Sequence, residues 1–99
     1  MYARMTIAQA QPDRFDEALS TVQETFLPAA REQRGYRGFL LLTDRSRQQL
    51  VGISLWETEA DVQDSGGASG YYQQRMSAFL ELLAGPPTTT THEVAVQEA

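Results

Sequence analysis

The stretch of sequence that decides the fold is LVGISLWET, residues 50–58. Branched apolar residues occupy every second position at 51, 53 and 55, which is the period of a β-strand. One face of this strand carries the branched residues Val51, Ile53 and Leu55. The other face carries Gly52, Ser54 and Trp56. We expect the first face to pack in the core, and the small residues of the second face to leave space beside the indole.

Turn residues and periodicity define the elements on either side. We expect strands at residues 2–10, 36–43 and 92–96, and helices at residues 13–35, 58–64 and 71–85. Thr58 begins a capping box, in which its hydroxyl accepts a hydrogen bond from a backbone amide of the first helical turn. Pro28 should kink or split the first helix, because proline has no amide donor and its ring crowds the preceding turn. A glycine-rich loop is expected at residues 65–70.

The order strand, helix, two strands, helix, strand is the split βαβ arrangement of ferredoxin-like folds. It predicts one α+β domain over residues 1–99, with an antiparallel sheet and the helices on one face. The run FLLL at residues 39–42 is apolar on both sides of its strand, yet the helices can cover only one side. An exposed apolar sheet face is a liability in a monomer, so we expect a two-fold homodimer with sheet packed against sheet.

The composition argues against several classes of function. A net charge of −5 and a pI near 4.7 disfavour binding to nucleic acid or to an anionic membrane, which call for clusters of Lys and Arg. The chain has no cysteine and one histidine, so we expect neither a disulfide nor a metal site. The sequence shows no signal peptide and no membrane-spanning run, which predicts a cytoplasmic protein.

Three features occur together along the chain: GYRGF at residues 35–39, Asp44, and the segment from Leu50 through WETEAD at residues 56–61. Together they resemble the antibiotic biosynthesis monooxygenase domain of the dimeric α+β-barrel superfamily, and the resemblance extends from Tyr2 to about Val96. It implies a dimeric α+β barrel, with a ligand cleft in each subunit between sheet and helices and with Trp56 at its wall. Members of this family include cofactor-independent oxygenases of aromatic polyketides, quinol oxygenases and haem-degrading enzymes.

The sequence departs from two branches of that family. The haem-degrading branch has a histidine on the helix after the tryptophan and an asparagine on the first strand. Here that helix has no histidine and Thr6 lies near the expected asparagine, so we expect no haem and no other cofactor. The polyketide oxygenases have an asparagine shortly before the tryptophan, where this chain has Gly52. Their later tyrosine and arginine are matched by Tyr71 or Tyr72 and by Arg75.

Most of the candidate site residues also have a structural interpretation. Trp56 and Tyr72 either sandwich an aromatic ligand or pack in the core. His92 is either a base or polar anchor in the cleft, since imidazole is the usual general base near neutral pH, or a hydrogen-bonded residue on the face of the last strand. Arg75 either contacts the substrate or is a solvated helix residue. Gly52 and Ser54 leave the space that a ligand would occupy.

Two functions stay open from the sequence. In the first, the chain is a cofactor-independent monooxygenase acting on an aromatic polyketide or quinol. His92 and Tyr72 are then catalytic, and the substrate contacts are Trp56, Gly52, Ser54 and Arg75. In the second, it is a non-catalytic dimeric domain that binds a small aromatic or apolar molecule. An open cavity lined by Trp56 and His92 would favour the first function, and a filled one the second.

Overall fold

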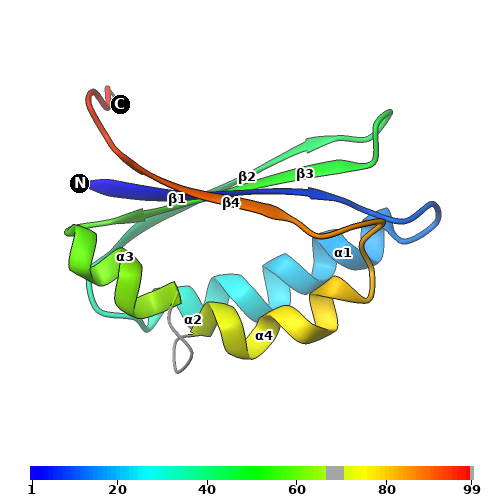
Figure 1. The fold of residues 1–99 in the computed structure, drawn as a ribbon, viewed down its shortest axis with the longest axis horizontal. Helices are drawn as coiled ribbons and strands as arrows, with labels where there is room; N and C mark the ends of the chain where they lie inside the picture. Colours follow the sequence, from blue (N-terminus) through cyan, green and yellow to red (C-terminus); the bar gives the residue numbers. More distant parts are fainter. Residues whose placement is uncertain (67–70, 99) are drawn as a thin grey trace.

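The computed structural model describes residues 1–66 and 71–98, apart from the side chain of Tyr71. The elements are β1 (Tyr2–Gln9), α1 (Phe15–Thr21), η1 (Val22–Phe26), α2 (Leu27–Arg31), β2 (Tyr36–Asp44), β3 (Gln49–Trp56), α3 (Glu59–Gly66), α4 (Tyr71–Leu80) and β4 (Thr88–Glu93). The strands form one antiparallel sheet in the order β2-β3-β1-β4, and the helices lie on one side of it (Figure 1). The predicted ferredoxin-like α+β fold is confirmed. Most of the predicted glycine-rich loop, residues 67–70, lies outside the described residues.

The core lies between the helices and one face of the sheet. On this face of β3, Leu50 and Trp56 are at most 2% exposed. On β1, Ala8, which pairs with Leu50, and Arg4, which pairs with Ser54, are also buried. The structure contradicts the expectation for the other face of β3, because its side chains point away from the helices and are only half-buried. These side chains are Val51, Ile53 and Leu55. The helices instead cover the face that carries the indole of Trp56, which has the most apolar surface to bury.

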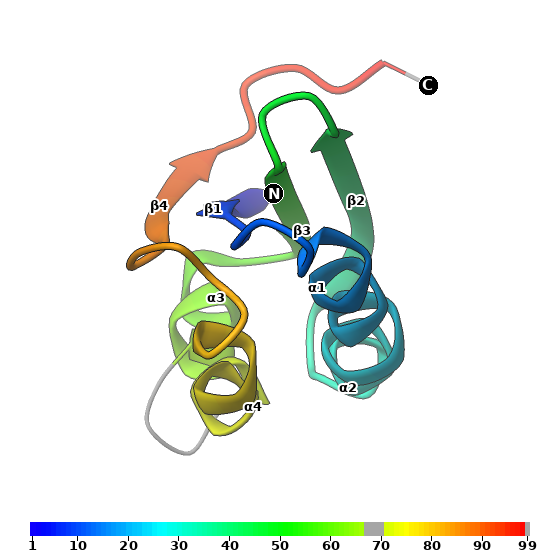
Figure 2. The same cartoon turned by 90° about the vertical axis from the view of Figure 1, so that its right-hand side faces the viewer.

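None of the described helices covers the opposite face of the sheet, which we call the outer face (Figure 2). It carries alternate residues of three strands: Ala3, Met5, Ile7, Leu40, Leu42, Val51, Ile53 and Leu55. Leu40 is 53% exposed and Leu42 is 49% exposed, so two large apolar side chains stand in solvent in the single chain. This is the two-sided apolar strand from which the sequence predicts a homodimer.

The hydrogen-bonding pattern of the first helix changes shortly before Pro28. α1 gives way to the π-helical turn η1, in which the Leu27 amide donates to the Val22 carbonyl five residues earlier. α2 then begins at Leu27, so Pro28 lies in the first turn of a new α-helix, where a missing amide donor is tolerated. The predicted interruption is therefore present as a π-turn that ends two residues before the proline.

The last strand begins earlier than the sequence predicts. Residues 92–96 were expected to form it, but β4 spans Thr88–Glu93. Its run of β-branched threonines pairs with β1, and the pairing ends where Glu93 lies opposite Tyr2, the first residue of β1. Val96, expected inside the strand, is 84% exposed.

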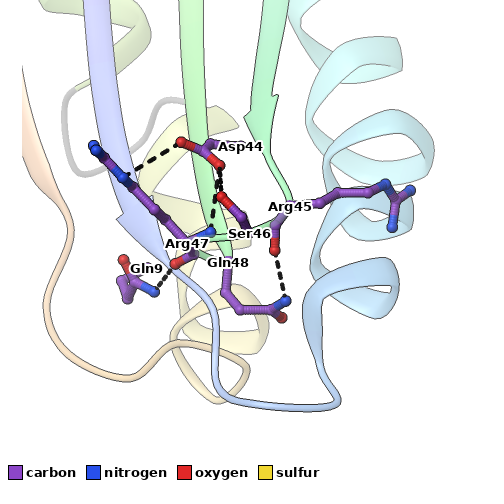
Figure 3. Close-up of polar contacts among 6 residues, drawn as sticks. All are labelled: Gln9, Asp44, Arg45, Ser46, Arg47 and Gln48. Atoms are coloured by element: carbon purple, nitrogen blue, oxygen red, sulfur yellow. Dashed lines mark hydrogen bonds and ion pairs between the residues drawn. The ribbon is translucent and has the colours of Figure 1, made fainter.

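A network of polar side chains fixes the turn between β2 and β3 (Figure 3). The Asp44 carboxylate accepts hydrogen bonds from the Ser46 hydroxyl at 2.8 Å and from the Arg47 amide at 3.3 Å. The bond from Ser46 is the main reason why the pKa of Asp44 lies below its ordinary value. Gln9 of β1 donates to the Arg47 carbonyl and so ties the turn to a third strand.

Candidate functional site

A cavity opens where the helix-facing side of the sheet meets η1 and α4. The space open to water-sized molecules is about 50 Å³, enough for a few waters. Apolar side chains form most of the wall: Ala8, Val22, Phe26, Phe39, Leu41, Leu50, Met76 and Phe79. The wall is completed by Gly52 and four polar residues, Arg4, Thr6, Ser54 and Tyr72. A mostly apolar pocket with a few polar groups has the composition of a ligand site.

Gly52 provides part of this space. It lies in the middle of β3, opposite Thr6 of β1 and Leu41 of β2. A Cβ atom placed on Gly52 would contact the Phe39 ring at 3.6 Å, which is an ordinary van der Waals distance. Ser54, the next residue on the same face, is buried and small. The structure thus brings Gly52 and Ser54 together on the cavity wall, where the sequence predicts a space.

Tyr72 reaches the cavity from α4. Its hydroxyl lies 3.0 Å from Thr6 Oγ1 and 2.8 Å from Thr89 Oγ1, so hydrogen bonds join α4 to both β1 and β4. Its ring packs against Phe26 of η1, with the ring centroids 5.9 Å apart. Thr89 is exposed, so this set of hydroxyls leads from the cavity wall to the surface.

Arg4 is the polar residue of the cavity that the sequence analysis missed. It lies in the middle of the sheet, only 4% exposed. Its Nη2 atom donates to the Val62 carbonyl at 2.9 Å and to the Ser65 hydroxyl, both in α3. Its guanidinium carbon lies 4.7 Å from the centre of the Tyr72 ring. Strand alternation puts Arg4 on the same face of β1 as Ala8, but alternation does not show which face the helices cover.

The structure does not bring His92 to this cavity. His92 lies opposite Ala3 in the pairing of β1 with β4, and Ala3 points to the outer face. Its Nε2 atom lies 2.8 Å from Thr90 Oγ1, which belongs to the same face. The register of β4 therefore separates His92 from Tyr72 by the thickness of the sheet.

Comparison with known proteins identifies solved structures with a similar fold. No family model matches the chain. Its structure is similar to that of Rv0793 from Mycobacterium tuberculosis, with a TM-score of 0.80 at 17% identity over 99% of this chain and 98% of that one. For an antibiotic biosynthesis monooxygenase the TM-score is 0.77 at 15% identity, over 97% and 100% of the two chains. A monooxygenase from the gene ActVA-Orf6 of Streptomyces coelicolor, in complex with the ligand Nanaomycin D, is also similar. The TM-score is 0.79 at 16% identity, over 99% of this chain and 92% of that one. The chain has the fold of the antibiotic biosynthesis monooxygenases.

Two curated relatives share sequence with this chain. They are the uncharacterized proteins Rv2557 and MT2634 of two Mycobacterium tuberculosis strains, each 30% identical to it over 95 residues. The match covers 96% of this chain but 41% of each relative. The chain therefore spans less than half the length of the curated relatives it matches.

Within this antibiotic biosynthesis monooxygenase fold, Trp56 packs in the core and does not line the cavity. It is 0% exposed, and its indole N–H donates to Ser54 Oγ at 2.8 Å. The Tyr36 ring meets the indole edge-on, with the centroids 6.0 Å apart. Of the two interpretations of Trp56, the structure favours the core. Trp56 lies behind the wall and holds the Ser54 hydroxyl in place.

Outside this cavity, the described residues supply no comparable site. Arg75 of α4 is half-buried and is not part of the cavity wall. A wider depression of about 380 Å³ lies elsewhere, but charged side chains dominate its wall, among them Arg34, Glu57, Asp61 and Asp64. Among residues 1–66 and 71–98 no three His, Cys, Asp or Glu side chains are grouped so that they could hold a metal ion. In the same residues, no helix is long and apolar enough to span a membrane.

Proposed function

We propose that the chain is a cofactor-independent monooxygenase that binds a small phenol or quinol in the cavity beside Gly52. The cavity itself carries this proposal. It is mostly apolar, it places a tyrosine hydroxyl and an arginine on its wall, and it occurs in a fold shared with proteins named as monooxygenases. The fold alone supports no particular substrate, so the substrate class follows from the chemistry of the wall.

An electron-rich phenol can reduce O₂ without a cofactor once it has lost its proton. A phenol with a free ring position and one O₂ give a quinone and water. One oxygen atom becomes the new carbonyl oxygen, the other leaves in water, and all the electrons come from the ring. The protein binds and orients the ring and excludes water. Phe26 and Phe39 supply aromatic walls for this task, and the Tyr72 hydroxyl supplies a hydrogen-bonding partner for the substrate oxygen.

The ligand must enlarge the cavity when it binds. A space of about 50 Å³ holds a few waters, which is less than an aromatic ring occupies. Met76 is the lining side chain best suited to move, because methionine is unbranched and has three rotatable bonds. Gly52 leaves the matching space on the sheet side.

A non-catalytic binding domain is the second candidate, and two observations favour it. Neither Trp56 nor His92, whose presence on the wall would have favoured the monooxygenase, lines the cavity. The described residues that line the cavity include no histidine, aspartate or glutamate, so the wall offers none of the side chains that most often act as a general base. In this alternative the same phenol or quinol binds in the same place and leaves unchanged.

We also propose that two copies of the chain associate through their outer faces. Leu40 and Leu42 carry this proposal, since each is about half exposed on the edge strand β2, beside the apolar residues of β3 on the same sheet face. The cavity lies on the other side of the sheet, so such a dimer leaves it accessible. Sedimentation at micromolar concentration should show twice the chain mass of 11.0 kDa, and a single species of 11.0 kDa would exclude the dimer.

Oxygen uptake in the presence of a panel of phenols, quinols and aromatic polyketides tests the proposed function. We expect one substrate to be oxygenated, with one atom of isotopically labelled O₂ found in the product. Gly52→Leu should abolish this activity because leucine fills the cavity. Gly85→Leu is the matched control, since a side chain at Gly85 meets open space. Binding of a panel member at the cavity without oxygen uptake would favour the second candidate, and no binding at all would exclude both.

A further inference from the structure

We propose that the Ser54 hydroxyl donates a hydrogen bond to a carbonyl oxygen of the ligand, so that the cavity selects aromatic ketones. The proposal rests on the proposed function only in that the cavity is taken as the ligand site. This ketone oxygen is a second anchor, in addition to the phenol oxygen that is placed at Tyr72. The proposal holds whether or not the bound ligand is then oxygenated.

Ser54 offers the cavity a hydrogen-bond donor. It lines the cavity and is only 4% exposed. A serine hydroxyl donates one hydrogen bond and accepts up to two. The Ser54 hydroxyl accepts a bond from the Trp56 indole at 2.8 Å, and no group among the described residues accepts a bond from it. A buried donor without an acceptor is costly, so a ligand oxygen that accepts this hydrogen adds to the affinity.

The other polar groups of the wall are already engaged within the protein. The hydroxyls of Thr6 and Tyr72 lie 3.0 Å apart and bond to each other. The Arg4 guanidinium donates to the Val62 carbonyl at 2.9 Å. A ligand has to compete with these partners, whereas at Ser54 it adds a bond that the described part of the chain does not make.

The indole positions the Ser54 hydroxyl and strengthens it as a donor. Trp56 is 0% exposed in the core, and its N–H holds the Ser54 oxygen in place. Because the indole hydrogen occupies one lone pair of that oxygen, the O–H bond of Ser54 points away from the indole. Hydrogen bonds in a chain polarise one another, so the bond from the indole makes Ser54 a better donor. A carbonyl oxygen, which accepts and cannot donate, is the matching group.

The pairing of β1 with β3 orders the cavity wall along the strands. Ser54 pairs with Arg4 at one end, and Leu50 pairs with Ala8 at the other, about 13 Å away along an extended strand. Gly52 lies between these two pairs. A ligand whose carbonyl oxygen bonds to Ser54 therefore has its ring over Gly52 and its apolar end toward Leu50.

The test compares two probes, 1-indanone and indane, which have the same two fused rings and differ in the ketone oxygen. Neither probe has a phenolic hydroxyl, so the readout does not depend on turnover. A hydrogen bond from Ser54 should move the C=O stretching band of bound 1-indanone to lower frequency than in an apolar solvent, as measured by infrared difference spectroscopy. Ser54→Ala should abolish this shift and weaken the binding of 1-indanone by about fivefold to tenfold. The affinity for indane should stay close to its wild-type value.

Two further variants assign the effect to the Ser54 hydroxyl. Ser54→Cys keeps the shape of the side chain with a weaker donor, so it should give a smaller band shift than the wild type. Ser77→Ala is the matched control, since Ser77 is exposed on α4, and it should behave as the wild type. Should Ser54→Ala fail to fold, the wild type and Ser54→Cys still decide.

Several results would overturn the proposal. They are an unshifted C=O band in the wild type, an equal loss of affinity for both probes in Ser54→Ala, and a failure of 1-indanone to bind. A shifted band without oxygen uptake from any phenol would leave the proposal standing and contradict the proposed function alone. Oxygen uptake from a phenol together with an unshifted band would overturn this proposal alone.

Discussion

Replacing Gly52 with alanine is expected to stabilise the protein, because the new methyl group enters existing space. Its Cβ atom would contact the Phe39 ring at 3.6 Å, and the cavity of about 50 Å³ lies beside it. Gly52 lies in the interior of β3, where glycine is a poor strand residue. The substitution therefore removes a disadvantage of the strand without creating a clash.

Two contributions set the size of this effect. Limiting the freedom of the unfolded chain contributes about 0.4–1 kcal/mol. Burying one methyl group contributes about 0.8 kcal/mol. Together they predict a gain of about 1–2 kcal/mol in the free energy of unfolding. For a domain of this size each kcal/mol raises Tm by about 4–8 °C.

Urea unfolding and thermal melts of the wild type and three variants measure this change in the free energy of unfolding. Gly52→Ala should be more stable than the wild type. Gly85→Ala should change stability by less than about 0.5 kcal/mol, since Gly85 is exposed and faces open space. Gly35→Ala should be destabilised by about 1 kcal/mol or more, because Gly35 has φ +81° and its Cβ would overlap the Asp61 side chain. Destabilisation of Gly52→Ala by about 1 kcal/mol or more would show that the space beside β3 is packed, and the site would have to be abandoned.

Three further outcomes are expected. Leu40→Asp should convert the proposed dimer to monomer in sedimentation while the fold survives; a dimer that persists in this variant would place the interface elsewhere. Ser46→Ala should raise the pKa of Asp44 toward its ordinary value in an NMR titration. Because that pKa is lowered in the folded state, the stability contributed by Asp44 is present above the unfolded-state pKa and is lost as the pH falls through the folded-state value. Ser46→Ala should therefore weaken this loss of stability in acid, and an unmoved pKa would refute the assigned cause. Tyr72→Phe should cost about 1 kcal/mol of stability by removing the hydroxyl from Thr6 and Thr89, and no loss would show that these bonds contribute nothing.

Local sequence patterns predicted the elements of the fold. Strand alternation and helix capping depend only on residues that are close together in the sequence. Alternation along residues 50–58 identified the central strand. The Thr58 hydroxyl accepts the predicted hydrogen bond, from the Asp61 amide at 3.1 Å. The space beside Gly52 was also predictable, because two small residues share one strand face with an indole. The direction in which that face points was harder to predict, since it depends on how the helices return over the sheet.

Tertiary information decides the positions of Arg4 and His92. Nothing local distinguishes a buried arginine on a strand from an exposed one, because its burial depends on α3 and α4 folding over it. His92 was expected on a strand at residues 92–96, but the β-branched threonines before it begin β4 at Thr88. The resulting pairing with Ala3 sends its side chain to the outer face. Strand register is set by the partner strand, and a shift of one residue exchanges the two faces.

A crystal structure of the protein soaked with an electron-rich phenol under anaerobic conditions examines the ligand site itself. We expect density for the ring beside Gly52, with its oxygen directed toward Arg4 or Tyr72 and with Met76 moved aside. A phenol bound on the outer face or in the polar depression near Asp61, with the cavity beside Gly52 empty and Met76 unmoved, would contradict the assignment of this cavity as the functional site.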